Sequence, residues 1–268
     1  MAITTMDGLV AGLGGAQRLV VNKANVVVAV AGRTMSLWSA AGQPGVGEVT
    51  AGTSTTGVVP DKTTVGALSF VNPASGSNSY LAGVRGFSAA TGMIILYDVL
   101  WQWTTPGWAL AAANNSAPAS TVALTRPDSS GTNTELWVET LAAGAVTAGT
   151  FTVTYTNSAL TASKSTGANA TIASPPTGTI QPLTLAAGDN GVSAVTNVTH
   201  STAWAGTHRL MIVRRLAEIP CTTLTAFSYN AVDLGMPRIY DNACLGMAFS
   251  ANSTATGPLM MSLSLAQG

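Results

Sequence analysis

Residues 150–157 alternate strictly between apolar and polar side chains. The apolar members are Phe151, Val153 and Tyr155, and the polar members are Thr152, Thr154 and Thr156. Because successive side chains of a β-strand point to opposite faces, this segment has one apolar face and one threonine face, a pattern that a helix cannot use. Residues 134–141 form a second strand-like run, joined to the first by a turn of small residues. We therefore predict a half-buried β-hairpin over residues 134–157 in an antiparallel sandwich or barrel.

Strand signals recur at short spacing along the rest of the chain. Residues 92–104 are apolar almost throughout, which predicts a central strand buried on both faces. Its one charged residue, Asp98, should be hydrogen-bonded or neutralised, and we expect an arginine partner rather than a catalytic role. Short strands separated by turns are typical of β-sandwiches and jelly rolls. The sequence therefore predicts an all-β protein in which residues 61–268 form an antiparallel β-sandwich or jelly-roll-like domain.

The N-terminal residues carry a helix signal. Thr5 followed by Asp7 resembles a helix cap with an acidic first turn. Four apolar residues then share one helical face, namely Met6, Leu9, Val10 and Leu13. Glycines within this segment weaken the helix, so we expect it to gain stability by docking, with a loosely ordered terminus as the alternative.

Residues 40–60 are rich in glycine and proline, which interrupt regular structure. A loop of this length in a compact domain tends to be functional or mobile. We expect either an extended arm that lies on a partner or an ordinary surface loop. With the short helix, this arm defines residues 1–60 as an N-terminal docking extension.

The chain is poor in charge. Charged residues make up 8% of it and the formal net charge is zero, whereas a typical soluble protein has about 25% charged residues. A surface of threonine, serine, alanine, asparagine and glycine suits a protein that is covered by neighbours in an assembly, because the cores of interfaces are depleted in charge. A secreted or cell-surface β-domain can share this composition.

The sequence also argues against nucleic-acid and membrane partners. Phosphate binding needs clustered cations, yet on a strand Arg209 and Arg215 share one face while Arg214 takes the other. No apolar run approaches the roughly 20 residues of a membrane-spanning helix. The N-terminal residues lack the basic segment of a secretory signal peptide.

We find no motif for catalysis, a cofactor or a metal. His200 and His208 could face each other across a turn, but a two-histidine metal site needs further ligands and nothing nearby supplies an obvious one. Glu135 and Glu139 would lie about 13 Å apart along a strand, which is too far for a glycosidase pair, and we expect them to be surface acids. The prediction is a protein without enzymatic activity, cofactor or metal.

Two further groups of residues have structural interpretations. Cys221 and Cys244 lie in apolar surroundings, which favours buried free thiols over a disulfide. Trp101, Trp103 and Trp108 cluster in the sequence and could stack on a sugar or anchor a partner. Because Trp101 and Trp103 share a face two residues apart, packing in a core or an interface is the favoured use.

Several segments resemble a group of tailed-bacteriophage virion proteins. They are the opening Met1-Ala2-Ile3-Thr4-Thr5-Met6-Asp7-Gly8-Leu9-Val10-Ala11-Gly12-Leu13, then Ser36-Leu37-Trp38, Ile95-Leu96-Tyr97-Asp98, Ala123-Leu124-Thr125-Arg126-Pro127-Asp128, Leu234-Gly235-Met236-Pro237-Arg238-Ile239-Tyr240-Asp241 and the closing Ser264-Leu265-Ala266-Gln267-Gly268. The resemblance spans most of the chain and implies a structural component of the particle.

The role that this resemblance implies is a head decoration, or cement, protein. Such a protein would be made in the host cytoplasm and would lie on the outer surface of the phage head. Its partners would be the major capsid protein and neighbouring copies of itself, as a homo-oligomer or side by side on the lattice. The alternative is a tail, baseplate or host-glycan-binding module, in which the three tryptophans would be exposed together. No binding residues are carried over from the group.

Uncharged and apolar residues on the expected surfaces give the candidate partner interface. An uncharged threonine face is notable because a free-standing domain more often places lysine or glutamate there, so we expect a neighbouring chain to shield it. The candidate residues are Met6, Leu9, Val10, Leu13, Trp38, Trp108, Thr152, Thr154 and Thr156.

Overall fold

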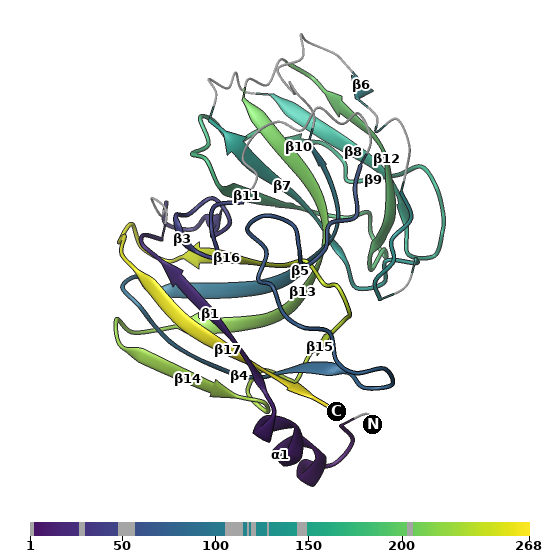
Figure 1. Cartoon of the computed structure of the whole chain (residues 1–268). Coiled ribbons are helices and arrows are strands. Elements are labelled where there is room, and N and C mark those ends of the chain that lie inside the picture. Colours follow the sequence, from purple (N-terminus) through teal and green to yellow (C-terminus); the bar gives the residue numbers. More distant parts are fainter. Residues whose placement is uncertain are drawn as a thin grey trace. The chain divides into compact units, whose positions relative to one another are not determined.

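The computed structural model describes residues 3–26, 30–47, 57–104, 115–116, 118, 122–127, 129–143, 149–202 and 206–268. In these residues the chain forms antiparallel β-sheets and the helix α1 (Met6–Gly14), as Figure 1 shows. The prediction of an all-β fold built from antiparallel sheets is confirmed.

The chain divides into two compact units. The first comprises Met1–Glu48, Asp61–Asp98 and Leu216–Gly268, and the second comprises Val49–Pro60 and Val99–Arg215. Two long strands, β5 (Gly92–Thr104) and β13 (Thr207–Cys221), contribute residues to both units. Each unit has its own cluster of buried apolar side chains.

A six-stranded sheet dominates the first unit. Its order is β14-β4-β17-β1-β3, with β15 paired to β4, and β14, β4, β17 and β1 lie side by side in Figure 1. The strand bounds are β1 (Gln17–Lys23), β3 (Gly42–Gln43), β4 (Ser79–Ser88), β14 (Ala226–Asn230), β15 (Arg238–Ile239) and β17 (Leu259–Gln267). Inward side chains such as Leu19, Leu263 and Val84 join Ile94 and Phe249 in one core. The opposite face of the sheet points outward, as is common for antiparallel sheets.

A second sheet closes as a barrel in the order β11-β2-β16-β5-β13-β7. Its remaining strands are β2 (Thr34–Ser36), β7 (Glu135–Ala142), β11 (Thr179–Leu183) and β16 (Leu245–Ala251). Residues 94–103 of β5 are buried without interruption, which confirms the predicted central strand. A closed barrel agrees with the barrel alternative that the sequence left open for the predicted hairpin, whereas sandwich packing and jelly-roll connectivity stay predictions.

The second unit contains a five-stranded sheet of order β10-β8-β12-β6, with β9 paired to β8. Its strands are β6 (Asn115–Ser116), β8 (Thr150–Asn157), β9 (Lys164–Ser165), β10 (Asn169–Ala170) and β12 (Val192–His200). Phe151, Val153 and Tyr155 of β8 are buried in a cluster with Trp101 and Leu136. The predicted alternation of β8 is therefore confirmed.

The predicted hairpin over residues 134–157 is wrong in its pairing. Both strands exist, but β7 pairs with β11 and β13, whereas β8 pairs with β12, β10 and β9. β7 is buried on both faces from Leu136 to Leu141, unlike the half-buried β8. A strand buried on both faces fits the barrel sheet, while an alternating strand fits a sheet with one solvent-facing side.

The segment predicted as an N-terminal extension contributes a strand to the first unit. β1 lies inside the six-stranded sheet, hydrogen-bonded to β17 on one side and to β3 on the other. In the predicted arm, residues 42–43 form β3, and the Gly47 N–H donates to the Trp38 carbonyl (2.9 Å). Residues 48–56 of the arm lie outside the described part of the chain.

The buried acid of the first unit, Asp98, is satisfied by a backbone partner. The Asp98 carboxylate accepts a hydrogen bond from the Cys244 N–H (2.8 Å), so this acid is hydrogen-bonded as expected, and its arginine partner stays a prediction. Cys221 and Cys244 are buried free thiols, which confirms that expectation. Burial raises the pKa of the Cys221 thiol to about 11.

Candidate partner-binding surface

Helix α1 leaves most of its apolar face uncovered. Thr5 caps the helix as predicted, with its Oγ1 accepting from the Gly8 N–H (3.1 Å). Leu9 is buried against three alanines of the sheet and the following turn, Ala82, Ala231 and Ala266. The remaining apolar residues point outward, with exposed fractions of 66% for Met6, 62% for Val10 and 42% for Leu13. The predicted face therefore exists, and only its edge at Leu9 packs on the protein.

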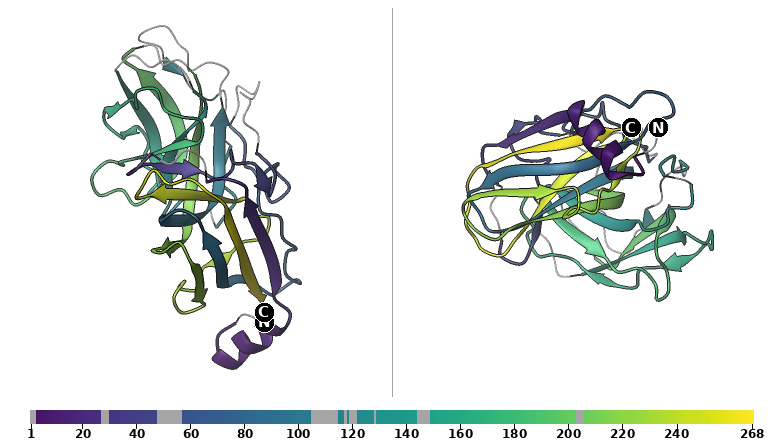
Figure 2. Two further views of the ribbon diagram at one scale, coloured as in Figure 1. Left: turned by 90° about the vertical axis from the view of Figure 1, so that its left-hand side faces the viewer. Right: turned by 90° about the horizontal axis from the view of Figure 1, so that it is seen from below.

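The helix lies on the outward side of the six-stranded sheet, at the end where β17 finishes (Figure 1, Figure 2). Beyond the helix, the outward face carries exposed apolar residues at its other end. Val20 of β1 is 57% exposed, Met260 of β17 is 52% exposed and Phe87 of β4 is 37% exposed. Met260 lies opposite Phe87 in the pairing of β17 with β4, and Val20 lies opposite Ser262.

Two exposed arginines lie between these apolar groups. Arg18 of β1 lies opposite Ser264, and Arg85 of β4 lies opposite Ser262. Outward residues of the strands and of α1 therefore make one continuous surface, apolar at both ends and cationic in the middle. We call it the helix–sheet surface, and its members are Met6, Val10, Leu13, Arg18, Val20, Gly83, Arg85, Phe87, Met260, Ser262 and Ser264.

The other predicted interface residues lie elsewhere. Trp38 is buried in the first unit, and a side chain at Gly47 or Gly66 would collide with its indole ring. Trp38 therefore fills the interior instead of offering an exposed contact. Trp108 lies outside the described residues.

The threonine face belongs to the second unit. Thr152, Thr154 and Thr156 are partly exposed on the outer side of β8, where Thr152 lies opposite Thr199 and Thr154 opposite Asn197 of β12. The face is uncharged, as the sequence predicted. Its shielding by a neighbouring chain stays a prediction.

The tryptophans nearest to Trp108 do not form an exposed aromatic platform. Trp101 and Trp103 are each 2% exposed and are part of the core of the second unit. The expectation of packing in a core is confirmed for both.

The two histidines are buried in different sheets. His200 ends β12 of the five-stranded sheet, and burial lowers its pKa to about 4. His208 lies in β13 of the barrel sheet, 3.5 Å from the Thr140 hydroxyl through its Nδ1. Within the described residues, no three histidine, cysteine or acidic side chains come together as a metal site would require.

The expectation that Glu135 and Glu139 are surface acids is wrong for Glu139. Glu139 is fully buried, and its Oε2 accepts hydrogen bonds from Arg209, which also donates to Gln102 (3.2 Å). Glu135 is partly exposed and pairs with Arg215 (2.9 Å). Burial opposes ionisation of Glu135, but hydrogen bonds from Arg215 and Trp137 outweigh it and lower the pKa of this carboxyl. Both acids serve ion pairs inside the second unit.

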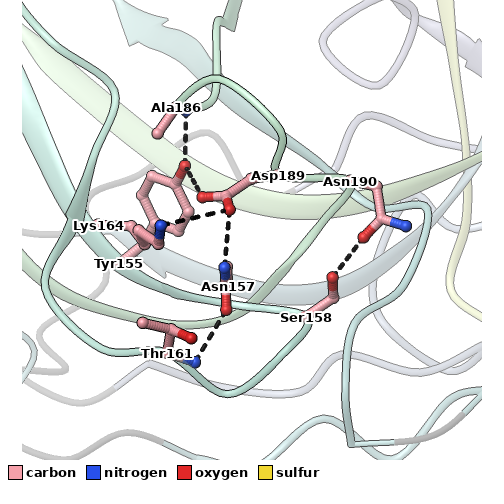
Figure 3. A network of polar contacts seen from close by, with 8 residues as sticks. All are labelled: Tyr155, Asn157, Ser158, Thr161, Lys164, Ala186, Asp189 and Asn190. Atoms are coloured by element: carbon pink, nitrogen blue, oxygen red, sulfur yellow. Dashed lines mark hydrogen bonds and ion pairs between the residues drawn. The ribbon is translucent and has the colours of Figure 1, made fainter.

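A polar network in the second unit holds two loops together (Figure 3). Asp189 accepts hydrogen bonds from the Asn157 amide (2.7 Å) and the Tyr155 hydroxyl (2.8 Å), and Lys164 lies 3.8 Å away. These hydrogen bonds lower the pKa of Asp189. Burial raises the pKa of Tyr155 to about 12, and its hydroxyl also accepts from the Ala186 N–H (2.7 Å). Because its donors and acceptors engage each other, the network is structural.

Sequence reasoning missed the sheet half of the helix–sheet surface. One signal was available, because Met260 occupies the same face as Ser262 and Ser264 in the alternating run of β17. An apolar residue on the polar face of an alternating strand marks exposed apolar surface. The placement of Val20, Phe87 and the two arginines beside Met260 depends on the long-range pairing of β17 with β1 and β4.

Comparison with protein-family models, curated proteins and solved structures finds no match to this chain. The helical residues that the structure describes include no segment of the length and hydrophobicity needed to cross a bilayer.

Proposed function

We propose that this protein is a non-enzymatic structural component of a phage particle. In this proposal it binds the major capsid protein lattice as a decoration protein and stabilises the head. The helix–sheet surface is the docking face, and neighbouring copies lie beside one another on the lattice. The threonine face of the second unit is the surface proposed to meet such a neighbour. The resemblance of the sequence motifs supports the class, and the surface supports the mode of action.

The observation that carries the proposal is the uncovered apolar face of α1. A nine-residue helix is below the length at which isolated helices are stable in water. Fully burying a valine, leucine or methionine side chain contributes about 1.5–3 kcal/mol. Covering the exposed parts of Met6, Val10 and Leu13 would therefore contribute about 3 kcal/mol to docking.

Docking of this kind stabilises a shell by mass action. A protein that binds the assembled lattice but not its separated subunits shifts the equilibrium toward the assembled state. The threonine face proposed to meet a neighbouring copy is uncharged, so close packing there would desolvate no charged threonine-face side chain. The proposed role therefore needs contacts and no chemical step.

The test uses phage particles that lack this protein, to which the purified protein is added back. Val10→Asp places a charge on the docking face, and Val65→Asp is the matched control because Val65 is also on the first unit and is 66% exposed. We expect wild type and Val65→Asp to bind the particles and raise the temperature of DNA release. Val10→Asp should bind at least about tenfold more weakly, as expected for the loss of a docking contact of about 1.4 kcal/mol or more.

Two results would contradict the proposal at different points. Equal release temperatures with and without the bound protein would remove the stabilising role. Full binding by Val10→Asp would remove α1 from the docking face. A map of the particle that places the copies on the tail would favour the tail or baseplate alternative, although the buried Trp101 and Trp103 offer no stacking platform for a glycan.

A further inference from the structure

A hollow opens on the helix–sheet surface beside the last turn of α1. Its volume is about 270 Å³, and its lining includes Leu13, Arg18, Gly83, Arg85, Ser262 and Ser264. Every one of these residues belongs to the first unit. The hollow therefore lies between the two apolar ends of the surface described above.

The two arginines at this hollow have no polar partner among the described residues. Neither Arg18 nor Arg85 makes a hydrogen bond or an ion pair with any residue that the structure describes, and both are exposed. In contrast, Arg209 and Arg215 are held by glutamates. Arginines that lack an internal partner can bind an external anion without breaking an existing contact.

The geometry allows both arginines to reach one ligand. They flank β17 on the outward face, two strands apart and displaced by two residues, which corresponds to about 12 Å between their Cα atoms. Two arginine side chains can converge across that distance, and the hydroxyls of Ser262 and Ser264 lie between them. Asp233, three residues beyond the lining residue Asn230, accepts a hydrogen bond from the Asn230 N–H (3.0 Å).

We propose that this hollow receives an aspartate or glutamate side chain from the protein on which this chain docks. The inference rests on the proposed docking function and names the chemistry of the partner. Arginine forks match the geometry of a carboxylate, and hydroxyl donors complete its hydrogen bonds. Apolar residues beside the partner's acid cover Val10 and Leu13 on one side, and Val20 and Met260 on the other. An acidic peptide segment can cover this flanking apolar surface with its own apolar side chains. An isolated phosphate ion would leave the same surface exposed.

Gly83 keeps the floor of the hollow open. A Cβ at this position would meet the Tyr229 carbonyl oxygen at 3.6 Å and the Ser264 Cβ at 3.9 Å, which are ordinary van der Waals distances. The backbone at Gly83 is not in the left-handed region, so a larger residue fits without strain. Gly83→Val should therefore fold, because valine favours strands, and should fill the hollow.

The test titrates the full-length protein with the peptide N-acetyl-Leu-Glu-Leu-amide and follows backbone amide signals by NMR. The matched peptide with Gln in place of Glu and inorganic phosphate are the comparison probes. We expect the Glu peptide to shift signals of β1, β4 and β17 next to the hollow, with millimolar affinity that weakens as salt is added. The Gln peptide should bind at least about threefold more weakly, which is within the range of exposed ion pairs.

Variants of the protein locate the binding. Gly83→Val and the double variant Arg18→Gln/Arg85→Gln should each abolish the shifts caused by the Glu peptide. Arg33→Gln removes a positive charge elsewhere in the first unit and should leave them unchanged. Equal binding of the Glu and Gln peptides, or unchanged binding by Gly83→Val, would overturn the proposal. Phosphate that shifts the same signals more strongly than the Glu peptide would also overturn it, in favour of a phosphate site.

The peptide titration is independent of the particle. Binding of the Glu peptide in the hollow supports the acidic-segment site even if added protein does not change DNA release. Conversely, suppose that the added protein stabilises the particle while Gly83→Val leaves its binding to the particle unchanged. That result supports the decoration role and excludes the hollow from the docking contact. The two proposals therefore fail separately.

Discussion

The buried lysine of β1 should make the first unit more stable at alkaline pH. Lys23 is 1% exposed, and its Nζ donates hydrogen bonds to the carbonyl oxygens of Ala40 (3.0 Å) and Pro44 (2.7 Å). Within the described residues it has no carboxylate partner. Burial lowers the pKa of Lys23 from 10.5 to about 8, because desolvation disfavours the charged form.

The sign of the effect follows from the two pKa values. Below pH 8 the lysine is charged in both states, and the folded state carries the full cost of burying the charge. Between pH 8 and 10.5 the folded lysine is neutral while the unfolded lysine is still charged, so the unfolded state binds more protons and stability rises with pH. From pH 7 to pH 10 the rise from this residue is about 2.5 kcal/mol.

Lys23→Met removes this titration and is the perturbation to use. At pH 7 the substitution removes the buried charge but leaves two carbonyl groups without a donor, and these opposing effects are each of about 1–3 kcal/mol. The informative quantity is therefore the difference between wild type and variant in the free energy of unfolding, measured by urea denaturation from pH 7 to pH 10. Burial also raises the pKa of the Cys221 thiol and of the Tyr155 phenol above their ordinary values in the folded protein, so both groups add to the pH dependence of stability. They are common to wild type and variant and cancel in the difference.

Direct titration gives an independent measurement. The chain has three lysines, Lys23, Lys62 and Lys164, so ¹³C-labelled lysine should give three Cε signals. One of them should titrate near pH 8 and be absent from Lys23→Met. If no lysine signal titrates near pH 8, or if the stability difference between the two proteins is flat from pH 7 to pH 10, the argument from burial is wrong.

Further substitutions test the interior of the second unit by urea denaturation. Glu139→Ala leaves the Arg209 charge buried and unpaired, which should lower the free energy of unfolding by about 3–5 kcal/mol. Glu135→Ala breaks the partly exposed pair with Arg215 and should lower it by about 1 kcal/mol or less. Equal losses in the two variants would contradict the assignment of a buried and an exposed pair. Tyr155→Phe removes the hydroxyl from the network of Figure 3 and should cost about 1–2 kcal/mol, and an unchanged midpoint would show that this network contributes nothing to stability.

The sequence correctly predicts structural features that depend only on neighbouring residues. The alternation in β8 reflects the pleat of a single strand, so Phe151, Val153 and Tyr155 were assigned to the core without knowledge of their neighbours. The cap at Thr5 and the helix that follows depend on residues within one or two turns. Such features need no information about distant parts of the chain.

Pairing between strands was not predictable in the same way. Residues 134–141 and 150–157 are close in the sequence and separated by small residues, so a hairpin was the simplest reading. The actual partners of β7 are β11 and β13, which lie about 40 and 70 residues further along. Glu139 was therefore assigned to the surface, because its partner Arg209 comes to it only through the pairing of β13 with β7.

The helix–sheet surface depends both on local sequence patterns and on long-range strand pairing. The sequence therefore predicts only its helical half. Met6, Val10 and Leu13 are brought together by the helical repeat alone. Arg18 and Arg85 meet only because β17, near the end of the sequence, is inserted between β1 and β4. A cationic hollow flanked by apolar residues is therefore a product of sheet order. It follows that a substitution that shifts the register of β17 by one residue should destroy the hollow, because a one-residue slip turns every outward side chain inward. The same slip should also remove Ala266 from its contact with Leu9, so that α1 loses packing as well.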